Sequence, residues 1–174
     1  AHRHADQPAC HLSVLDGEEA LDLHAVESTH SLRVCNPPGG RFPVHASSTG
    51  KVLLTWAPDD VRGQILAKPL RRYTSHTITS ARALRQELDR IRERNYAVDN
   101  REYDPYTWCA AAPIRGRAGR CVAALGLSAV ASRLTAAQRR AVCRAVLAAA
   151  AEVSCSLGCS AVTRPEAAPK RGAA

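Results

Sequence analysis

The sequence predicts a single α+β domain in which helices pack against a mainly antiparallel sheet. Three observations support this fold class. The 174 residues are enough for one sizeable core. Alternating apolar and polar residues near both ends of the chain are typical of strands joined by short turns. Stretches with helix caps and helical spacing lie between and after those strands, and no internal repeat is present.

The first strands are expected between residues 10 and 35. Cys10 to Leu15 and Ala20 to Val26 alternate in polarity around the turn signal Asp16-Gly17, which predicts a hairpin. A third strand is expected over residues 30–35, before Asn36-Pro-Pro-Gly-Gly interrupts regular structure. Three consecutive antiparallel strands would form a meander.

Three helices are expected next. Ser47 or Ser48 can cap a short helix that continues to Trp56. Pro58, placed at a first helical position, predicts a second helix that ends before Pro69. Ser80 can cap a third helix, whose buried stripe is Leu84, Leu88 and Ile91 and whose end is expected at Asn95, followed by a strand from Tyr96.

The stretch from Val98 to Ser128 is expected to form the centre of the domain. Apolar runs on both sides of residues 115–120 predict two neighbouring strands, and Gly116 and Gly119 can supply the positive φ that the connection needs. Alternation places Thr107 and Cys109 on one face with Trp108 on the other, and it places Gly126 and Ser128 on a shared face. Small polar groups on one face of adjacent strands favour the wall of a small-molecule pocket.

A long final helix is expected from Thr135, because Thr135 and Gln138 have the spacing of a capping box. Its apolar stripe is predicted as Val142, Val146, Ala149, Val153 and Leu157, with Gly158 as the C-cap. The composition of residues 160–174 (Ala, Pro, Lys, Arg) predicts a disordered tail.

The composition argues against several functions. The net charge is +8, but the arginines are spread along the chain and many alternate with acids, which favours a solvated surface over a nucleic-acid groove. No apolar run approaches the roughly 20 residues of a membrane span. Seven cysteines with no CxxC pair and no secretory signal favour free thiols in the cytoplasm, with neither a metal site nor a cofactor. The absence of methionine indicates a segment of a longer product.

Three stretches carry a resemblance to a known family: HASSTGKVLL from His45, TITSARALRQELDRIRERNYAVD from Thr77, and CAAAPIRGRAGRCVAALGLSAVASRLT from Cys109. In order and spacing they resemble the C-terminal effector-binding domain of the IclR family of bacterial transcriptional regulators. The resemblance covers about residues 9–157. It implies a GAF/profilin-like fold, with a curved six-stranded sheet flanked by helices.

The resemblance also implies an organisation and a function. Residues 1–8 would end an interdomain linker, residues 9–159 would form the effector-binding domain, and a winged helix-turn-helix would precede this segment and make the DNA contact. The domain would bind a small-molecule effector, a carboxylate or aromatic acid, and assemble as a homodimer or homotetramer, without enzymatic activity. The effector-binding positions carry over to Ser48, Thr49, Asp99, Thr107, Cys109, Gly126, Ser128, Ser31 and Val34.

Alternative interpretations remain for some of these residues. Cys109 and Cys121 could form the centre of a GAF-like thiol enzyme or of a redox sensor, which requires a low thiol pKa and a resolving thiol nearby. SSTGK resembles a phosphate-binding loop, but His45 stands in place of the leading Gly and Val52 in place of the Ser or Thr that holds magnesium. His45 is expected to be a structural histidine near a helix start.

Overall fold

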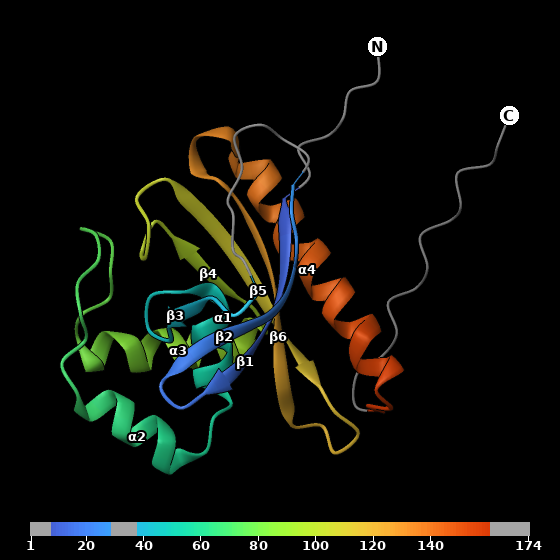
Figure 1. The fold of residues 1–174 in the computed structure, drawn as a ribbon, viewed down its shortest axis with the longest axis horizontal. Helices are drawn as coiled ribbons and strands as arrows, with labels where there is room; N and C mark the ends of the chain where they lie inside the picture. The colour runs from blue at the N-terminus through green and yellow to red at the C-terminus, as the bar shows by residue number, and fades with distance from the viewer. Residues whose placement is uncertain (1–7, 29–37, 161–174) are drawn as a thin grey trace, which may run out of the picture.

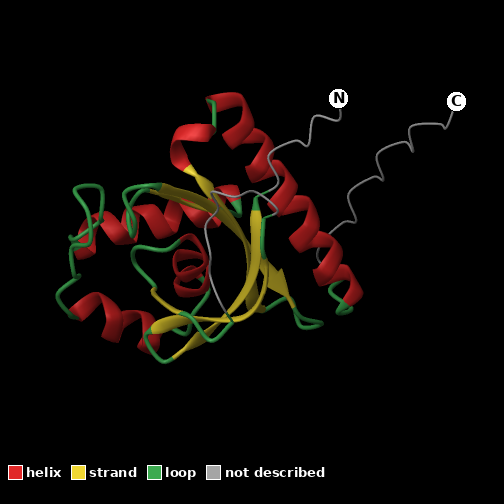
Figure 2. Ribbon diagram, turned by 45° about the horizontal axis from the view of Figure 1, so that its top comes forward, coloured by secondary structure: helices red, strands yellow, loops and turns green. Residues whose placement is uncertain are grey.

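A computed structural model describes residues 8–28 and 38–160, and its strands form one curled sheet (Figure 1). The strand order is β3-β2-β1-β6-β5-β4, and every neighbouring pair is antiparallel. Figure 2 shows α1 inside the curve of the sheet and the long helix α4 on the opposite side. The predicted α+β class with a curved six-stranded antiparallel sheet is confirmed.

The strands agree with the predicted ones at five of six places. They are β1 (Ala9–Asp16), β2 (Glu19–Val26), β3 (Arg41–Pro43), β4 (Ala97–Asn100), β5 (Thr107–Arg115) and β6 (Cys121–Val130). The sequence interpretation missed β3, because three residues are too few to show alternation. The strand expected at residues 30–35 and the tail beyond residue 160 lie outside the described residues.

The helices begin and end close to the predicted residues. They are α1 (Ser48–Thr55), α2 (Asp59–Ala67), α3 (Ala81–Arg94) and α4 (Ala136–Ser156). Ser47, Ser80 and Thr135 cap three of them with their side chains. Pro58 occupies the N-cap of α2 and not its first helical position. Asn95 ends α3 in the left-handed conformation, with φ of 62°.

The two faces of the sheet cover two separate apolar clusters. On the concave side α1 packs on the strands that carry Ala97, Ala111 and Ala124, whose small side chains let the helix approach closely, and α3 packs against α1. On the convex side α4 packs on the other face of β5 and β6, where Trp108 is the largest side chain. The predicted opposite orientation of Trp108 and Cys109 follows from this alternation.

The buried stripe of α4 differs from the predicted one. The buried residues are Cys143, Val146, Ala150 and Ser154, whereas Val153 and Leu157 are exposed. An alanine-rich helix has little amphipathic contrast, so the predicted stripe agrees at Val146 and is one residue too early at Val142, Ala149 and Val153. Ser154 belongs to the buried face because its hydroxyl accepts the N–H of Arg115 and donates to the carbonyl of Ala150.

In the connection between β5 and β6, only one of the two glycines has the positive φ that favours glycine. Gly119 has φ of 73°, and its N–H donates to the carbonyl of Gly116 at 2.8 Å. Gly116 is not in the positive-φ region, so the expectation that both glycines supply it was wrong for Gly116.

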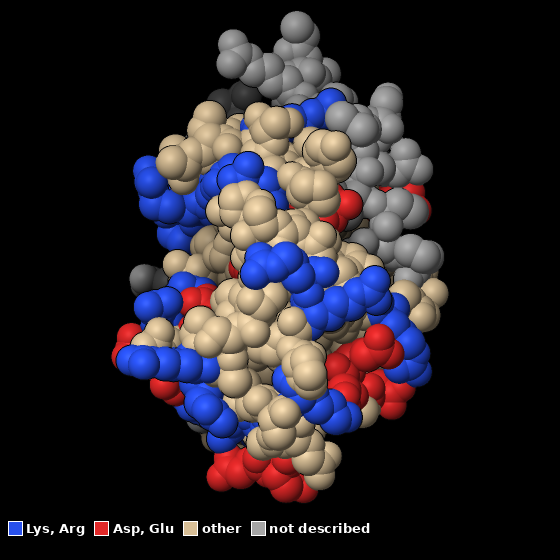
Figure 3. Space-filling model, turned by 90° about the vertical axis from the view of Figure 1, so that its left-hand side faces the viewer, with Lys and Arg blue, Asp and Glu red and all other residues tan. Residues whose placement is uncertain are grey.

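Basic and acidic side chains alternate over the helical side of the molecule. On α3, Arg90 and Arg94 both pair with Glu87, and Arg92 pairs with Asp89. Figure 3 shows Lys and Arg in separated groups on this side, with Asp and Glu between them. Within residues 8–28 and 38–160, no helix combines the length and the apolar character that a membrane crossing requires.

Candidate functional site

Polar side chains form neighbouring rows across the concave face of the sheet. Asp99, Cys109 and Ser128 lie directly opposite one another on β4, β5 and β6. Directly opposite residues of antiparallel strands point to the same side. Cys109 precedes Ala111 by two positions, and Ala111 packs under α1, so the whole row faces the inside of the curve. All three residues are buried.

The adjacent rows add three polar residues from the first hairpin. His11 lies opposite Gly126, and Ser13 lies opposite both Ala124 and Asp22. Each of these side chains is at most 5% exposed. We call the six residues Asp99, Cys109, Ser128, His11, Ser13 and Asp22 the concave polar cluster.

Three atoms of the concave polar cluster are buried without a hydrogen-bond partner in the described structure. They are His11 Nδ1, Asp22 Oδ2 and Ser128 Oγ, and the last lies beside the thiol of Cys109, which is only a weak hydrogen-bonding group. Ser13 donates to the other Asp22 oxygen. Buried polar atoms are normally paired, because an unpaired one loses its bond to water without compensation. Unpaired atoms on one face therefore indicate a place where a ligand supplies the missing partners.

The first turn of α1 is buried where the chain enters the curve of the sheet. The Ser47 hydroxyl accepts the N–H of Gly50 and donates to the carbonyl of Pro43 at 2.9 Å. Ser48 and Thr49 are both buried. Their N–H groups have no acceptor within the helix, so this end of α1 carries a partial positive charge suited to a carboxylate.

An ion pair fixes α1 to the loop after β4. Lys51 Nζ donates to Glu102 Oε1 at 2.6 Å, to Oε2 at 2.7 Å and to the carbonyl of Val98 at 2.6 Å. The side chain of Lys51 is 1% exposed. The N–H of Glu102 in turn donates to Asp99 Oδ1 at 2.6 Å. Asp99 is thus held in place from the same network that anchors α1.

Burial controls the protonation of the cluster. It raises the pKa of Asp99 to about 7, although the backbone N–H of Glu102 opposes that shift. It also raises the pKa of Asp22 to about 6 and lowers the pKa of His11 to about 4. Near neutral pH the imidazole is therefore uncharged, and one of its ring nitrogens donates while the other accepts.

Most of the predicted effector positions come together on the concave side. Five of them lie on the concave face of β4, β5 and β6: Asp99, Thr107, Cys109, Gly126 and Ser128, of which Thr107 is half-buried at the start of β5. Ser48 and Thr49 form the first turn of α1, within the curve of the sheet. Ser31 and Val34 lie outside the described residues. The sequence interpretation missed His11, Ser13 and Asp22, because alternation in the first hairpin is equally typical of a solvent-exposed face.

The two thiols of the redox alternative are far apart. Cys109 lies opposite Ser128, whereas Cys121 lies opposite Arg115, seven residues earlier on β6. At about 3.3 Å per residue the separation along the strand is roughly 23 Å, too far for a resolving thiol. Burial also raises the pKa of Cys109 to about 12 and that of Cys121 to about 11. Both thiols are protonated at neutral pH, which disfavours nucleophilic chemistry.

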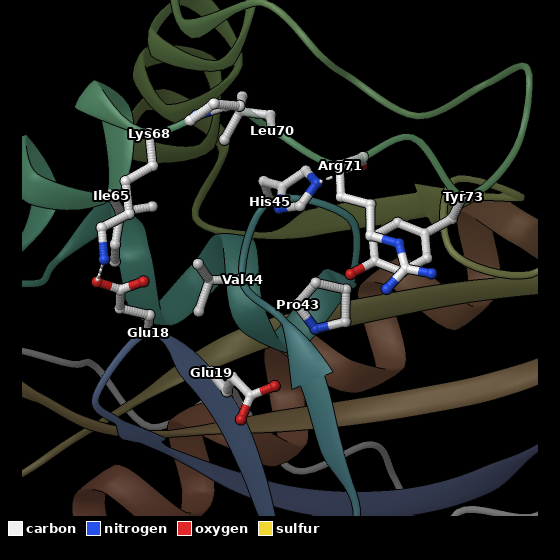
Figure 4. A pocket seen from close by; sticks show the side chains of 11 residues that line it. Glu18, Glu19, Pro43, Val44, His45, Ile65, Lys68, Leu70, Arg71 and Tyr73 are labelled. Carbon is white, nitrogen blue, oxygen red and sulfur yellow. Dashed lines mark hydrogen bonds and ion pairs between the residues drawn. The ribbon is translucent and has the colours of Figure 1, made fainter.

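A cleft of about 410 Å³ lies outside the concave polar cluster, near the β1–β2 turn (Figure 4). Its lining includes Glu18 and Lys68, which pair with each other. His45 belongs to its wall, where Nε2 is 2.9 Å from the carbonyl oxygen of Arg71. That contact fits the expected structural role of His45, since it ties the start of α1 to the loop after α2. Among the described residues, no three His, Cys, Asp or Glu side chains gather as a metal site.

The raised pKa of Asp99 gives a testable pH dependence. The folded state keeps a proton that an unfolded Asp, with its ordinary pKa of 3.8, loses. The stability contributed by this proton is complete below about pH 4 and falls as the pH rises to about 7, by at most about 1.4 kcal/mol per pH unit. Urea unfolding of wild type and Asp99→Asn at pH 4.5, 5.5, 6.5 and 7.5 measures this. We expect the stability of wild type relative to the variant to decrease with pH, and a constant difference would contradict the assignment.

The family model of the bacterial transcriptional regulator IclR C-terminal domain matches residues 3–155. The chain belongs to this family. The regulator BhcR of Paracoccus denitrificans is 39% identical over 144 residues, which are 82% of this chain and 52% of BhcR. This IclR-family chain thus spans about half the length of the curated relatives it matches.

Solved structures of the IclR family have the same fold. The IclR protein of Thermotoga maritima is 30% identical, with a TM-score of 0.81 over 88% of this chain and 62% of its own. An IclR homolog from Microbacterium hydrocarbonoxydans, solved in complex with 4-hydroxybenzoate, is 31% identical, with a TM-score of 0.75 over 86% of this chain and 60% of its own. The fold expected from the family resemblance is confirmed.

Proposed function

We propose that this chain is the effector-sensing part of a longer bacterial regulator, and that a small organic acid binds between the start of α1 and the concave polar cluster. The observation that carries the proposal is the set of three unpaired buried atoms on one face, Nδ1 of His11, Oδ2 of Asp22 and Oγ of Ser128. The relatives support it, since they are named as transcriptional regulators and one homolog was solved with an aromatic hydroxy acid.

The proposed binding uses the two kinds of group that the site offers. The carboxylate accepts hydrogen bonds from the first N–H groups of α1 and from the hydroxyls of Ser48 and Thr49. The rest of the acid lies over Cys109 and Ser128, next to the His11 ring that covers Gly126, with Thr107 and Asp99 at the edge. None of these groups is arranged as a nucleophile with a base, so we propose binding without catalysis.

The regulatory step in this proposal is a shift between two arrangements of a homodimer or homotetramer. The effector must bind one arrangement more tightly than the other, because equal affinity for both would shift nothing. A winged helix-turn-helix preceding this segment would read the shift on cytoplasmic DNA. The Lys51–Glu102 pair supports such coupling. It joins α1, whose start would bind the effector carboxylate, to the loop that positions Asp99.

A thermal-shift screen against small carboxylic and aromatic acids tests the proposed site. An effector at about 100 times its Kd should stabilise the fold by about 2.7 kcal/mol. Ser128→Ala should reduce this shift with little effect on the melting temperature of the unliganded protein, because the hydroxyl has no strong partner to lose and lies beside the weakly hydrogen-bonding thiol of Cys109.

Ser132→Ala is the matched control, because Ser132 is exposed beyond the end of β6. It should leave both the melting temperature and the ligand-induced shift unchanged. Two results count against the proposal: a folded protein that no acid stabilises, and a Ser128→Ala variant whose ligand-induced shift equals that of wild type.

A further inference from the structure

The side chain of His11 fills the space that a side chain at Gly126 would need. They lie opposite each other on β1 and β6, and a Cβ built on Gly126 would come within 2.2 Å of His11 Nε2 and 2.6 Å of Cε1. Real Cβ atoms do not approach other atoms so closely. The imidazole therefore lies directly over the backbone of Gly126, and the absence of a side chain at that position is what makes room for it.

The His11 ring lies on the concave face, and its Nδ1 takes part in no hydrogen bond with the described residues. His11 is 5% exposed. In the same row Ala111 supplies only a methyl group. The polar neighbours along the face are Ser128, whose hydroxyl lies beside the weakly hydrogen-bonding thiol of Cys109, and Ser13, which donates a hydrogen bond to Asp22.

A hydroxyl group on a ligand matches this surface. An uncharged imidazole has one donor and one acceptor, and a hydroxyl can both give and receive a hydrogen bond. An analogue without the hydroxyl should bind more weakly. Its binding would exclude water from the ring nitrogen of His11 without supplying a hydrogen-bond partner in return.

We propose that His11 is a specificity-determining residue that binds a hydroxyl group of the effector, so that the site selects small hydroxy acids over the same acids without the hydroxyl. This inference rests on the proposed function, because it places the effector on the concave polar cluster. It assigns to β1 a part of the site that lies outside the positions carried over from the family.

Matched acid pairs test the inference. We would measure Kd by titration calorimetry for 4-hydroxybenzoate against benzoate, lactate against propanoate, and 3-hydroxybutyrate against butyrate. Wild type should bind the hydroxy acid of at least one pair tenfold or more tightly than its partner. His11→Phe keeps a ring over Gly126 but removes both nitrogens, and it should abolish that preference while retaining affinity for the acid without the hydroxyl.

Two further variants keep the test decisive. Gly126→Ala places a methyl group where the ring now lies and should displace His11, with the same loss of preference even if His11→Phe does not fold. His24→Phe is the matched control, since His24 is an exposed histidine on β2, and it should leave the preference intact.

The outcomes separate this inference from the proposed function. If no acid of any kind binds wild type, the proposed function fails, and the inference fails with it. If acids bind but hydroxy acids have no advantage, or if their advantage survives in both His11→Phe and Gly126→Ala, only the assignment of His11 is overturned.

Discussion

Lys51→Met is expected to lower the free energy of unfolding by about 3–5 kcal/mol, the usual cost of removing one partner of a buried ion pair. The ammonium group makes three bonds, two of them to Glu102, from a side chain that is almost wholly buried. Without it, the Glu102 carboxylate and the Val98 carbonyl lose their donor inside the protein. Urea unfolding at pH 7 measures the loss.

Two controls identify the cause of that loss. Lys68→Met removes a lysine from an exposed ion pair with Glu18 and should change the stability by less than about 1 kcal/mol. The double variant Lys51→Met/Glu102→Leu removes both charges, and it should recover much of the stability, because a buried pair can be replaced by apolar groups at little cost. A double variant as unstable as the single one would show that packing, and not the unpaired charge, causes the effect.

Gly50→Ala is expected to destabilise the domain by about 1–3 kcal/mol or more, in the range of overpacked cores. A Cβ on Gly50 would lie 2.5 Å from the Cα of Val44 and 2.5 Å from the Ser47 hydroxyl. The Val44 contact is to backbone, which cannot rotate away. Chemical denaturation should detect the loss, and a weaker effector-induced shift should accompany it, because the displaced Ser47 caps the helix that begins the site.

Gly63 provides a control of the same chemistry. It lies within α2, and a Cβ there would meet nothing within 4 Å. Gly63→Ala should therefore stabilise the protein by about 0.4–1 kcal/mol, because alanine restricts the unfolded chain and suits a helix better. Opposite signs for the two substitutions would show that close approach, and not helix propensity, requires glycine at position 50. Equal signs would contradict this.

The elements with strong local sequence signals, such as helix caps and apolar periodicity, were predicted correctly. The third helix has a cap at Ser80, a stripe of large apolar residues and an end at Asn95; all three are observed, and the structure adds that Asn95 is left-handed. The strand β3 and the exact face of α4 carry no such signal. A three-residue strand forms because Arg41–Pro43 lies against β2, and an alanine-rich helix takes its orientation from the sheet it meets. Both are tertiary effects.

About half of the candidate site was predictable from the sequence, for a related reason. Thr107, Cys109, Gly126 and Ser128 are in a hairpin whose alternation could be read directly, and the family resemblance supplied Ser48, Thr49 and Asp99. His11 and Asp22 carry polar side chains in a hairpin where polar residues are expected on the solvent side. Only the curl of the sheet turns that side inward. Gly126 was a partial signal, because a glycine within a strand often marks the close approach of another group.

The strand order has a consequence for how the domain becomes functional. β1 lies between β2 and β6, so the first strand of the sheet pairs with the last. Contacts between such distant segments close a large loop and form slowly. During synthesis, β1 cannot pair with β6 until residues Cys121–Val130 have left the ribosome. Only then can the His11 side chain pack over Gly126. Binding at the proposed effector site therefore requires the complete sheet, which would make such binding a direct assay for the fully folded chain.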